Sequence, residues 1–396
     1  MSRKFDIIVL GATGYTGKLV CEMLKKQTIK TGAWAIAGRS QDKLTKMSQA
    51  LGLSVPTFTF DVEKPETLDA VCSQATVVIS CAGPFNLVGM PVVDSCVRCG
   101  THYVDSTGEF TFVRKVIEKH HDEAVKKNIV MVSCCGFGCV PSDVGNYILH
   151  KEAKQRGEEV KSVCCYYDMK VAGASDGTVH SVGSTFDAMT RKDMDPCSLN
   201  GSDASIRPYS APSRKGMWYH WAMGTFSAPL APAGSNERVV RRTNYLMKSR
   251  ASYVEAMVGG FFPMLKNTIG LYLLGAILMI APVRRWLLNK FFPLGPQNGP
   301  SEELKKNSRV CATFVGETDK KNVLTTTLVE NRDTYDATAV YLVACAVSAS
   351  DLAKSNKIVP GVLTPCSAFG EKLVTLCLKN GMEVSTTINT EDKKTK

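Results

Sequence analysis

Several features that would identify a common class of protein are absent from this sequence. No basic run with interleaved aromatic residues accompanies the formal net charge of +11, so we expect no nucleic-acid partner. A nucleotide phosphate or an anionic lipid surface explains this charge equally well. The first apolar run, Phe5–Leu10, is too short for a signal peptide and is typical of a strand. We therefore predict an intracellular protein without a signal peptide.

Metal and disulfide patterns are also missing, although the chain has 15 cysteines. Adjacent cysteines such as Cys134 and Cys135 are poor disulfide partners, and most of the others lie in apolar runs. Cys96 and Cys99 form a C-x-x-C, but no second pair and no nearby histidine set completes a zinc site. We predict buried thiols in a reducing compartment, and no metal.

The hydrophobic pattern alternates between short apolar runs and helical stretches. With 44% hydrophobic and 21% charged residues, the 396-residue chain is globular and long enough for two domains. Apolar runs at 5–10, 33–38, 76–83 and 128–135, separated by helices, predict an α/β fold with a Rossmann-type doubly wound parallel sheet. The alternation changes after about residue 155. We assign residues 1–145 plus 334–396 to the first domain and 146–333 to a second.

A glycine-rich stretch, GATGYTG at residues 11–17, separates the first strand from the first helix. Gly11 permits a tight turn, Gly14 lets a pyrophosphate approach the backbone, and Gly17 lets the helix pack on the strand. N–H groups at the helix N-terminus then hold the anion. The stretch predicts a dinucleotide site with contacts from Gly11, Thr13, Gly14, Tyr15, Thr16 and Gly17.

Cofactor selectivity is predicted from the end of the second strand. Arg39 and Ser40 stand there, where an NAD-binding protein usually places an acid for the ribose hydroxyls. An arginine suits the 2′-phosphate, so we predict NADP(H) in preference to NAD(H). Asp61, at the end of the third strand, is a candidate for contact with the adenine edge. Further backbone contacts are predicted after the fourth strand, at Ala82, Gly83 and Pro84.

A family resemblance extends over nearly the whole length. GATGYTG, AGRSQDKL, ISCAGPF, YVDSTGE and CGFGCVPSDVG, followed by RVVRRTNYL and GVLTPCSAFG, resemble the saccharopine dehydrogenase-like oxidoreductases. The resemblance implies a Rossmann domain, a second α+β domain with a mixed sheet, and an oxidoreductase activity. It does not imply saccharopine as the substrate. Related reductases act on lipid-like enoyl groups, which adds an apolar carbonyl, imine or enoyl compound to the candidate substrates.

One position departs from the family pattern. The family usually has an aspartate after Gly136-Phe137, where this chain has Gly138. The missing carboxylate removes a potential acid, base or orienting group. Asp143 and Glu109 remain as candidates for that role. Asp143 also has a structural explanation, because the helix dipole favours an acid in the first turn of a helix.

A competing catalytic pair is Tyr147 and Lys151, a Y-x-x-x-K on a predicted helix with Ser133 upstream. The spacing places both side chains on one helical face. The pair resembles that of short-chain dehydrogenases, in which Tyr donates a proton, Lys lowers its pKa and Ser positions the carbonyl. The intervening Pro141 and Gly145 fit the first family better. The catalytic residues therefore stay undecided among Tyr147, Lys151, Asp143 and Glu109.

An apolar segment lies at about residues 251–293. Its uncharged stretch Thr268–Val283 has 16 residues, fewer than the roughly 20 needed to cross a bilayer. Lys266 lies on one side, Trp286 with several cations on the other, and the apolar run 257–265 upstream. We predict a helical hairpin that enters one leaflet of a membrane or the surface of a lipid droplet from the cytosolic side. A buried or dimer-interface helix and a full span are the alternatives.

Two functions stay open at this point. The first is a membrane- or lipid-droplet-associated NADP(H)-dependent oxidoreductase, and the second is a catalytically silent nucleotide-binding or scaffold protein at a lipid surface. The intact glycines and Arg39 favour the first, and Gly138 favours the second. Under both hypotheses the expected partners are a nicotinamide dinucleotide, a lipid surface and a second copy of the chain as a homodimer.

Overall fold

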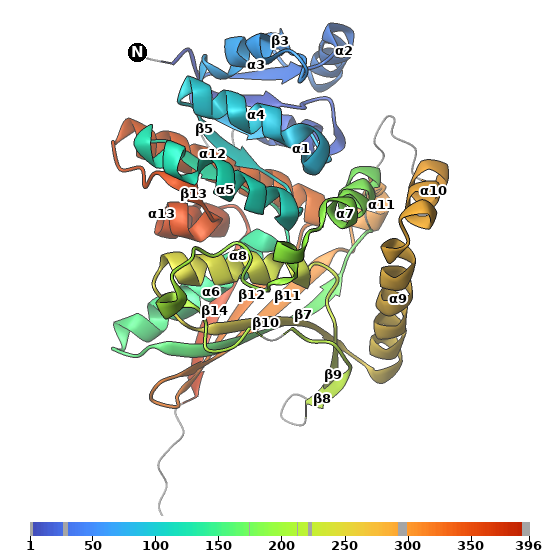
Figure 1. Cartoon of the computed structure of the whole chain (residues 1–396), viewed down its shortest axis with the longest axis vertical. Helices are drawn as coiled ribbons and strands as arrows, with labels where there is room; N and C mark the ends of the chain where they lie inside the picture. Colours follow the sequence, from blue (N-terminus) through green and yellow to red (C-terminus); the bar gives the residue numbers. More distant parts are fainter. Residues whose placement is uncertain are drawn as a thin grey trace, which may run out of the picture.

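A computed structural model of the chain describes residues 3–26, 31–173, 175–211, 213–220, 224–291 and 299–389. Two sheets form the centres of two domains, one above the other in Figure 1. The last two residues of the predicted apolar segment and the end of the chain after 389 lie outside the described residues.

The first sheet is parallel throughout, with the strand order β13-β6-β5-β4-β1-β2-β3. Its strands are β1 (Phe5–Leu10), β2 (Trp34–Gly38), β3 (Thr57–Thr59), β4 (Ala75–Ser80), β5 (His102–Asp105), β6 (Val130–Val132) and β13 (Gly361–Leu363). Successive side chains of a strand point to opposite faces, so Ile7 and Val9 join one core cluster and Ile8 and Leu10 the other. The strand order reverses between β1 and β4, which is where doubly wound sheets bind ligands.

Helices cover both faces of this sheet. Those whose buried side chains share a core with Ile7 and Val9 are α1 (Tyr15–Lys26), α2 (Gln41–Leu51) and α12 (Thr334–Lys354). Those on the opposite face are α3 (Pro65–Cys72), α4 (Phe85–Cys99) and α5 (Phe110–Lys126). Two more helices, α6 (Cys139–Gln155) and α13 (Pro365–Lys379), pack against each other, and α6 also contacts the second sheet.

The second sheet is mixed, because only its β7–β10 pair is parallel. In spatial order its strands are β14 (Met382–Asn389), β12 (Val323–Glu330), β11 (Arg309–Thr318), β7 (Val160–Lys170), β10 (Ser252–Gly259), β9 (Thr225–Ala228) and β8 (Trp218–His220). Its other elements are α7 (Asp176–Ala188), η1 (Arg191–Met194), η2 (Ala204–Ile206), α8 (Ala233–Leu246), α9 (Phe261–Met279), α10 (Ala281–Phe291) and α11 (Glu302–Lys305). A second domain with a mixed sheet is thus present.

The C-terminal part differs from the sequence prediction in one respect. Residues 334–379 pack with the first domain, since β13 pairs with β6 and α12 packs on α1. The final strand, β14, instead pairs antiparallel with β12 in the second sheet. Strand pairing across more than fifty residues of sequence is set by tertiary contacts, which a local pattern does not contain.

Residues 261–291 of the apolar segment form two consecutive helices beside the second sheet (Figure 1). The two runs predicted as arms of a hairpin do not face each other, because residues 257–259 complete β10 and the single helix α9 starts at Phe261. The shorter helix α10 follows at once and contacts both α9 and α7. The segment therefore stands at the edge of the molecule with one side against the protein.

Candidate functional site

The glycine-rich loop is packed tightly against the end of β4. Gly11 has φ +76°, and a Cβ on it would lie 2.8 Å from the backbone nitrogen of Ala82. A Cβ on Gly17 would lie 2.3 Å from the carbonyl oxygen of Gly11, and the Gly14 N–H donates to that same oxygen at 3.0 Å. The loop is thus a tight backbone cradle at the start of α1, and it fits the pyrophosphate of a dinucleotide.

The predicted selectivity residues lie at the same edge of the sheet. Arg39 follows β2 with its side chain exposed, and Ser40 begins α2, its hydroxyl accepting from the Lys43 N–H at 3.4 Å. Asp61 follows β3, and its carboxylate accepts from the Glu63 N–H at 3.0 Å. Because β4, β1, β2 and β3 are consecutive in the sheet, their carboxyl ends bring the cradle, Arg39, Asp61 and the turn at 82–84 together.

The side chain of Tyr15, in the loop itself, contacts residues outside residues 1–145. Its hydroxyl donates to the carbonyl oxygen of Pro300 at 3.4 Å, and its ring stands edge-on to Tyr335 at 5.1 Å between centroids. The ammonium of Lys305 lies 5.6 Å from the centroid of the Tyr15 ring. Burial alone would lower the pKa of Lys305, but the hydrogen bond to Glu302 and the charge of Asp336 raise it. Tyr15 of the phosphate loop is therefore packed against residues 300–305 and α12, a contact that the sequence did not reveal.

Glu109 fixes the turn that follows β4. The N–H groups of Phe85 and Asn86, at the start of α4, donate to its two carboxylate oxygens at 2.8 Å each. The hydroxyl of Ser184, on α7, donates to one of the same oxygens at 2.8 Å. Glu109 is buried, and an acid at a helix N-terminus stabilises the helix. Its carboxylate therefore positions both the turn that follows β4 and helix α7 of the second domain.

Comparisons with known proteins agree with this geometry. Residues 7–132 match the family model described as saccharopine dehydrogenase NADP binding domain. A trans-acting enoyl reductase from Mycobacterium leprae is 30% identical over 424 residues, covering 97% of this chain and 98% of its own length. A Mycobacterium tuberculosis relative, whose name proposes the same activity for it, is 31% identical over 413 residues with the same coverage.

The chain belongs to the saccharopine dehydrogenase-like oxidoreductases. The fold agrees: the structure of a saccharopine dehydrogenase (L-Glu forming) from Saccharomyces cerevisiae matches with a TM-score of 0.55 at 14% identity, over 96% of this chain and 99% of that one. The Rossmann domain, the NADP(H) cofactor and the NADP-dependent oxidoreductase class predicted from the sequence are thereby confirmed.

In this saccharopine dehydrogenase-like oxidoreductase, Tyr147 and Lys151 lie away from the phosphate loop. Both are on α6 against α13: the Lys151 ammonium pairs with Glu371 at 2.8 Å, and the Tyr147 hydroxyl lies beside Gly370. Strand β13, which precedes α13, is at the edge of the first sheet, four positions from β1. Ser133, the third member of the predicted set, donates instead to Asp105 at 2.7 Å. The structure therefore does not bring the dyad and the cradle together.

Asp143 holds the start of α13. Its carboxylate accepts from the N–H of Cys366 at 2.7 Å, and its second oxygen has no partner within the described part of the chain. Complete burial raises the pKa of Asp143 to about 7. Asp105 is similarly buried, and desolvation raises its pKa to about 6. Both acids tie neighbouring segments of the first domain together.

A carboxyl group that sequence reasoning missed lies near Gly138. A Cβ on Gly138, whose φ is +99°, would lie 3.1 Å from the amide oxygen of Asn236, and Asn236 donates to Glu255 at 2.9 Å. Glu255 also accepts from Ser142 at 2.5 Å and from Tyr253 at 2.8 Å. Burial raises its pKa to about 7. The only signal in the sequence was an acid inside the apolar strand SYVEAMVG.

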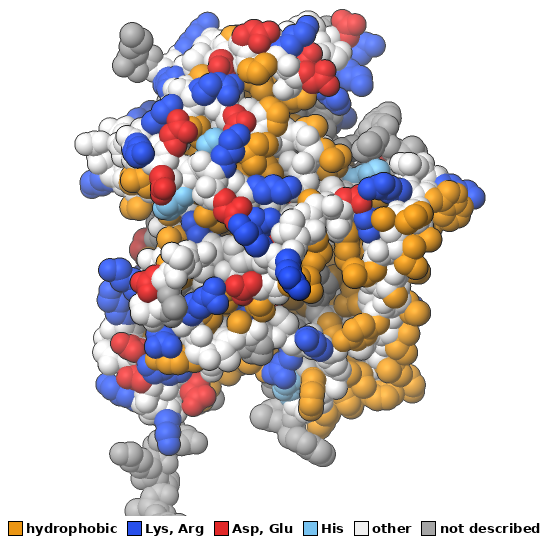
Figure 2. All heavy atoms as spheres, in the orientation of Figure 1, with side chains coloured by type: hydrophobic (Ala, Val, Ile, Leu, Met, Phe, Trp, Pro, Cys, Tyr) orange, Lys and Arg blue, Asp and Glu red, His pale blue; other side chains and the backbone are white. Residues whose placement is uncertain are grey.

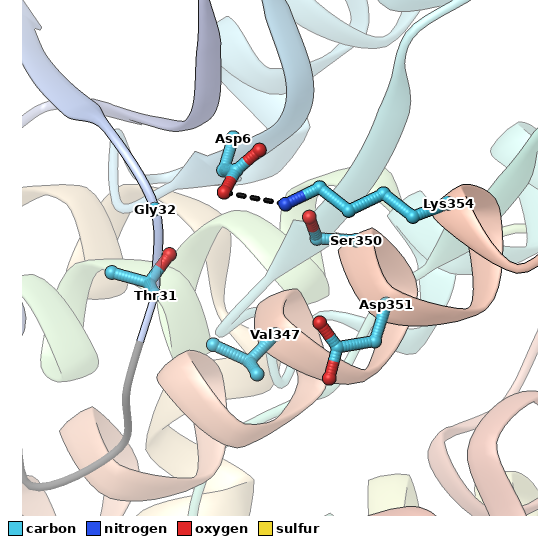
Figure 3. A pocket seen from close by; sticks show the side chains of 7 residues that line it. All are labelled: Asp6, Thr31, Gly32, Val347, Ser350, Asp351 and Lys354. Carbon is cyan, nitrogen blue, oxygen red and sulfur yellow. Dashed lines mark hydrogen bonds and ion pairs between the residues drawn. The ribbon is translucent and has the colours of Figure 1, made fainter.

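Other sites in the described ranges have different characters. No group of three His, Cys, Asp or Glu side chains there is arranged to hold a metal ion. A cavity of about 210 Å³ lies at the opposite, amino-terminal edge of the first sheet (Figure 3). Its charged residues are paired, as in the Lys354–Asp6 ion pair at 2.7 Å. It is separate from the cofactor cradle.

Proposed function

We propose that the protein is an NADPH-dependent reductase that acts on a lipid-like substrate with an enoyl or carbonyl group, at the cytosolic face of a membrane or lipid droplet. One observation carries the proposal: the chain that holds the dinucleotide cradle also presents a 19-residue apolar helix, α9, with only 6% of its apolar window buried. The names of the mycobacterial relatives support an enoyl group as the acceptor. The free state of all 15 cysteines is consistent with a reducing compartment.

Residues of the first domain would hold the cofactor. The cradle of Gly11, Gly14 and Gly17 would take the pyrophosphate, and Arg39 would meet the 2′-phosphate from the end of β2. Bound NADPH supplies the hydride. Glu109 keeps the turn at Pro84–Asn86 in place through two backbone hydrogen bonds. The protein's own part is thus to bind, orient and desolvate the reactants.

The apolar face consists of exposed side chains on α9, on α10 and at the residue between them (Figure 2). Its members are Phe261, Phe262, Ile269, Tyr272, Leu273, Leu274, Ile277, Met279, Ile280, Val283, Trp286 and Phe291. Soluble monomers rarely expose contiguous apolar patches of more than a few hundred Å² unless a partner or a lipid covers them. The other long apolar helix among the described residues, α12, is 78% buried and forms part of the core instead.

Charge and aromatic placement favour lipid over a protein partner. Lys266 and Arg285 are exposed on the same helices, and the Lys290 ammonium lies 4.8 Å from the centroid of the Trp286 ring. Tryptophan and lysine prefer the boundary between headgroups and hydrocarbon. An anionic surface also attracts a chain of net charge +11. These features support a lipid surface as the occupant of the apolar face.

The topology supports surface docking rather than a span. Strand β10 precedes α9, and β11 is the first strand after α10 and α11. Both strands belong to the same sheet, so the segment starts and ends on one side of a lipid layer. A crossing helix would need a second crossing to return. The 11 residues of α10 extend only about 16 Å, roughly half of a hydrocarbon core. We therefore propose that α9 and α10 lie in one leaflet.

Vesicle flotation tests the lipid part. We expect the protein to float with phosphatidylcholine vesicles that contain phosphatidylserine, and the double variant Leu273→Asp/Ile277→Asp to stay in solution. The matched control is Val125→Asp/Val359→Asp, which places the same charges on exposed apolar residues far from α9. If the protein instead forms dimers by sedimentation velocity and ignores vesicles, a second copy covers the face and the lipid proposal fails.

Calorimetry and turnover test the enzymatic part. We expect NADPH to bind more tightly than NADH, with Arg39→Ala weakening NADPH by about tenfold or more, because a charge-assisted hydrogen bond contributes about 1.5–3 kcal/mol. The control is Lys46→Ala, which removes an exposed cation on the neighbouring helix α2. Oxidation of NADPH should follow addition of long-chain 2-enoyl thioesters or aldehydes. Cofactor binding without turnover of any of them would favour the catalytically silent scaffold.

A further inference from the structure

Helix α7 contacts both the cofactor side of the molecule and the apolar helices. It packs on α4 and α5 of the first domain and on α9 and α10 of the second. In Figure 1 it lies between the first domain and α10. Helix α7 is therefore placed between the first domain and the apolar helices.

Two contacts of α7 reach the predicted cofactor site. In the middle of the helix, Ser184 donates to Glu109, the same carboxylate that holds the N–H groups of Phe85 and Asn86. At its start, the Thr178 hydroxyl lies 2.7 Å from the hydroxyl of Tyr335, whose ring packs on Tyr15 of the phosphate loop. The position of α7 therefore bears on both the phosphate loop and the turn after β4.

Two further contacts of α7 reach α10. Asp187 accepts hydrogen bonds from Arg284 and from Arg285, the second at 3.2 Å. Gly183 meets Leu288 so closely that a Cβ on the glycine would lie 2.4 Å from the leucine side chain. The side chain of Arg284 is only 4% exposed, and Asp187, which is 35% exposed, is the acid that compensates its charge. The two helices are thus joined by ion pairs from Asp187 to Arg284 and Arg285 and by the contact of the Leu288 side chain with Gly183.

Ser184 and Asp187 are three residues apart, one turn of the same helix, so they move together. A lipid surface that fixes α9 and α10 also fixes Asp187, and with it the hydrogen bond from Ser184 to Glu109. In the same way, a dinucleotide that orders the phosphate loop and the turn after β4 orders α7. Each ligand then meets an element that the other has already ordered.

We propose that α7 couples lipid docking to cofactor binding, so that the reductase takes up NADP(H) more tightly when the apolar face is on a lipid surface. The inference rests on the proposed function and adds regulation to it. Because coupling between two equilibria is reciprocal, NADPH strengthens vesicle binding by the same factor. The effect keeps the cofactor-loaded enzyme at the surface where an apolar substrate is dissolved.

Paired titrations with the full chain test the coupling. The dissociation constant of NADPH is measured by fluorescence with and without phosphatidylcholine–phosphatidylserine vesicles. Vesicle partitioning is then measured by flotation with and without saturating NADPH. We expect both quantities to improve by about fivefold, at the lower end of typical coupling factors. Coupling requires that vesicles enhance NADPH binding by the same factor as NADPH enhances vesicle binding. A change of light scattering or of protein stability does not require the two factors to be equal.

Two variants interrupt the coupling by different means. Asp187→Asn removes the charge that holds Arg284, and Gly183→Ala pushes Leu288 away without changing any charge. Neither residue is in the cradle or on the apolar face. The control is Asp69→Asn, an acid 35% exposed like Asp187 and also bound to an arginine, Arg98, but on the outer helices α3 and α4. Circular dichroism checks that each variant is folded.

The outcomes separate the two proposals. Binding of vesicles and of NADPH with a mutual enhancement that persists in Asp69→Asn and disappears in Asp187→Asn or Gly183→Ala supports the coupling. Binding of both ligands without mutual enhancement overturns the coupling and leaves the proposed function intact. Enhancement that survives in both interrupting variants also overturns the role of α7. Absence of vesicle binding defeats the lipid part of the proposed function, and the coupling with it.

Discussion

Gly17, at the start of α1, lies against the carbonyl oxygen of Gly11, and a Cβ on Gly17 would approach that oxygen to 2.3 Å. The clash would be with backbone, which cannot rotate away as a side chain can. The contact sets the path of the loop on which the dinucleotide pyrophosphate would rest.

We therefore expect Gly17→Ala to weaken NADPH binding by roughly tenfold or more, equivalent to about 1.4 kcal/mol or more. Isothermal calorimetry measures the change. Gly275→Ala on α9 is the control, because a Cβ there meets nothing within 4 Å. Unchanged affinity in Gly17→Ala would show that the loop can shift without loss of the cofactor and would weaken the assignment of the cradle.

The parts of the fold that were predicted from the sequence depend on local patterns. The alternation of Ile7 and Val9 with Ile8 and Leu10 between two cores makes β1 a continuous apolar run, and the glycines after it mark the turn. Residues 365–379 show the limit of such patterns. Proline and glycine are typical of turns, yet Pro365 is at the first position of α13, and Gly370 makes a kink within the helix with φ +46°.

The sequence predicted only those parts of the site that lie at the ends of individual strands. Arg39 follows β2, which is next to β1, and Asp61 comes shortly after β3, the next strand outward, so both lie at the edge of the sheet that carries the cradle. The bond from Ser184 to Glu109 joins residues 75 positions apart, and Lys305 reaches Tyr15 from the second domain. Such contacts depend on how the domains pack, which no local spacing encodes. For the same reason, Tyr147 and Lys151 satisfied a spacing rule without facing the cofactor cradle.

A buried ion pair anchors the segment after α7 to the first domain. Arg114 on α5 donates to Asp193 at 2.7 Å, and their side chains are 7% and 0% exposed. Removing one partner of such a pair leaves the other charge desolvated. We expect Asp193→Ala to lower the free energy of unfolding by about 3–5 kcal/mol in urea titrations. Lys192→Ala, which removes an exposed pair with Glu118, should cost less than about 1 kcal/mol. Equal losses would contradict the dominant role of burial.

The candidate dyad of the Y-x-x-x-K pattern, Tyr147 and Lys151, can be tested directly by enzyme kinetics. Because Lys151 is paired with Glu371 and the Tyr147 hydroxyl lies beside Gly370, we expect Tyr147→Phe to keep turnover within about threefold of wild type. The measurement is the rate of NADPH oxidation with the substrate found in the screen above. A loss of a hundredfold or more is the scale of a missing general acid, and it would restore the dyad as the proton donor.

Asp143 predicts a particular dependence of stability on pH. Burial raises its pKa in the folded protein to about 7, above its ordinary value of 3.8. Between these values the folded state binds a proton that the unfolded state has lost, so stability falls as pH rises and levels off above about 7. Asp143→Asn keeps an acceptor for the Cys366 N–H but cannot ionise. The variant should therefore gain about 2 kcal/mol relative to wild type between pH 5 and 7.

Urea unfolding at several pH values measures the difference in free energy of unfolding between the variant and wild type. The control is Asp122→Asn, which changes an exposed acid on α5, and its difference from wild type should stay constant over this pH range. Other buried acids, such as Asp105 and Glu255, are present in both proteins and cancel in the comparison. A variant that follows the wild-type curve throughout this range would mean that Asp143 is already ionised in its buried position.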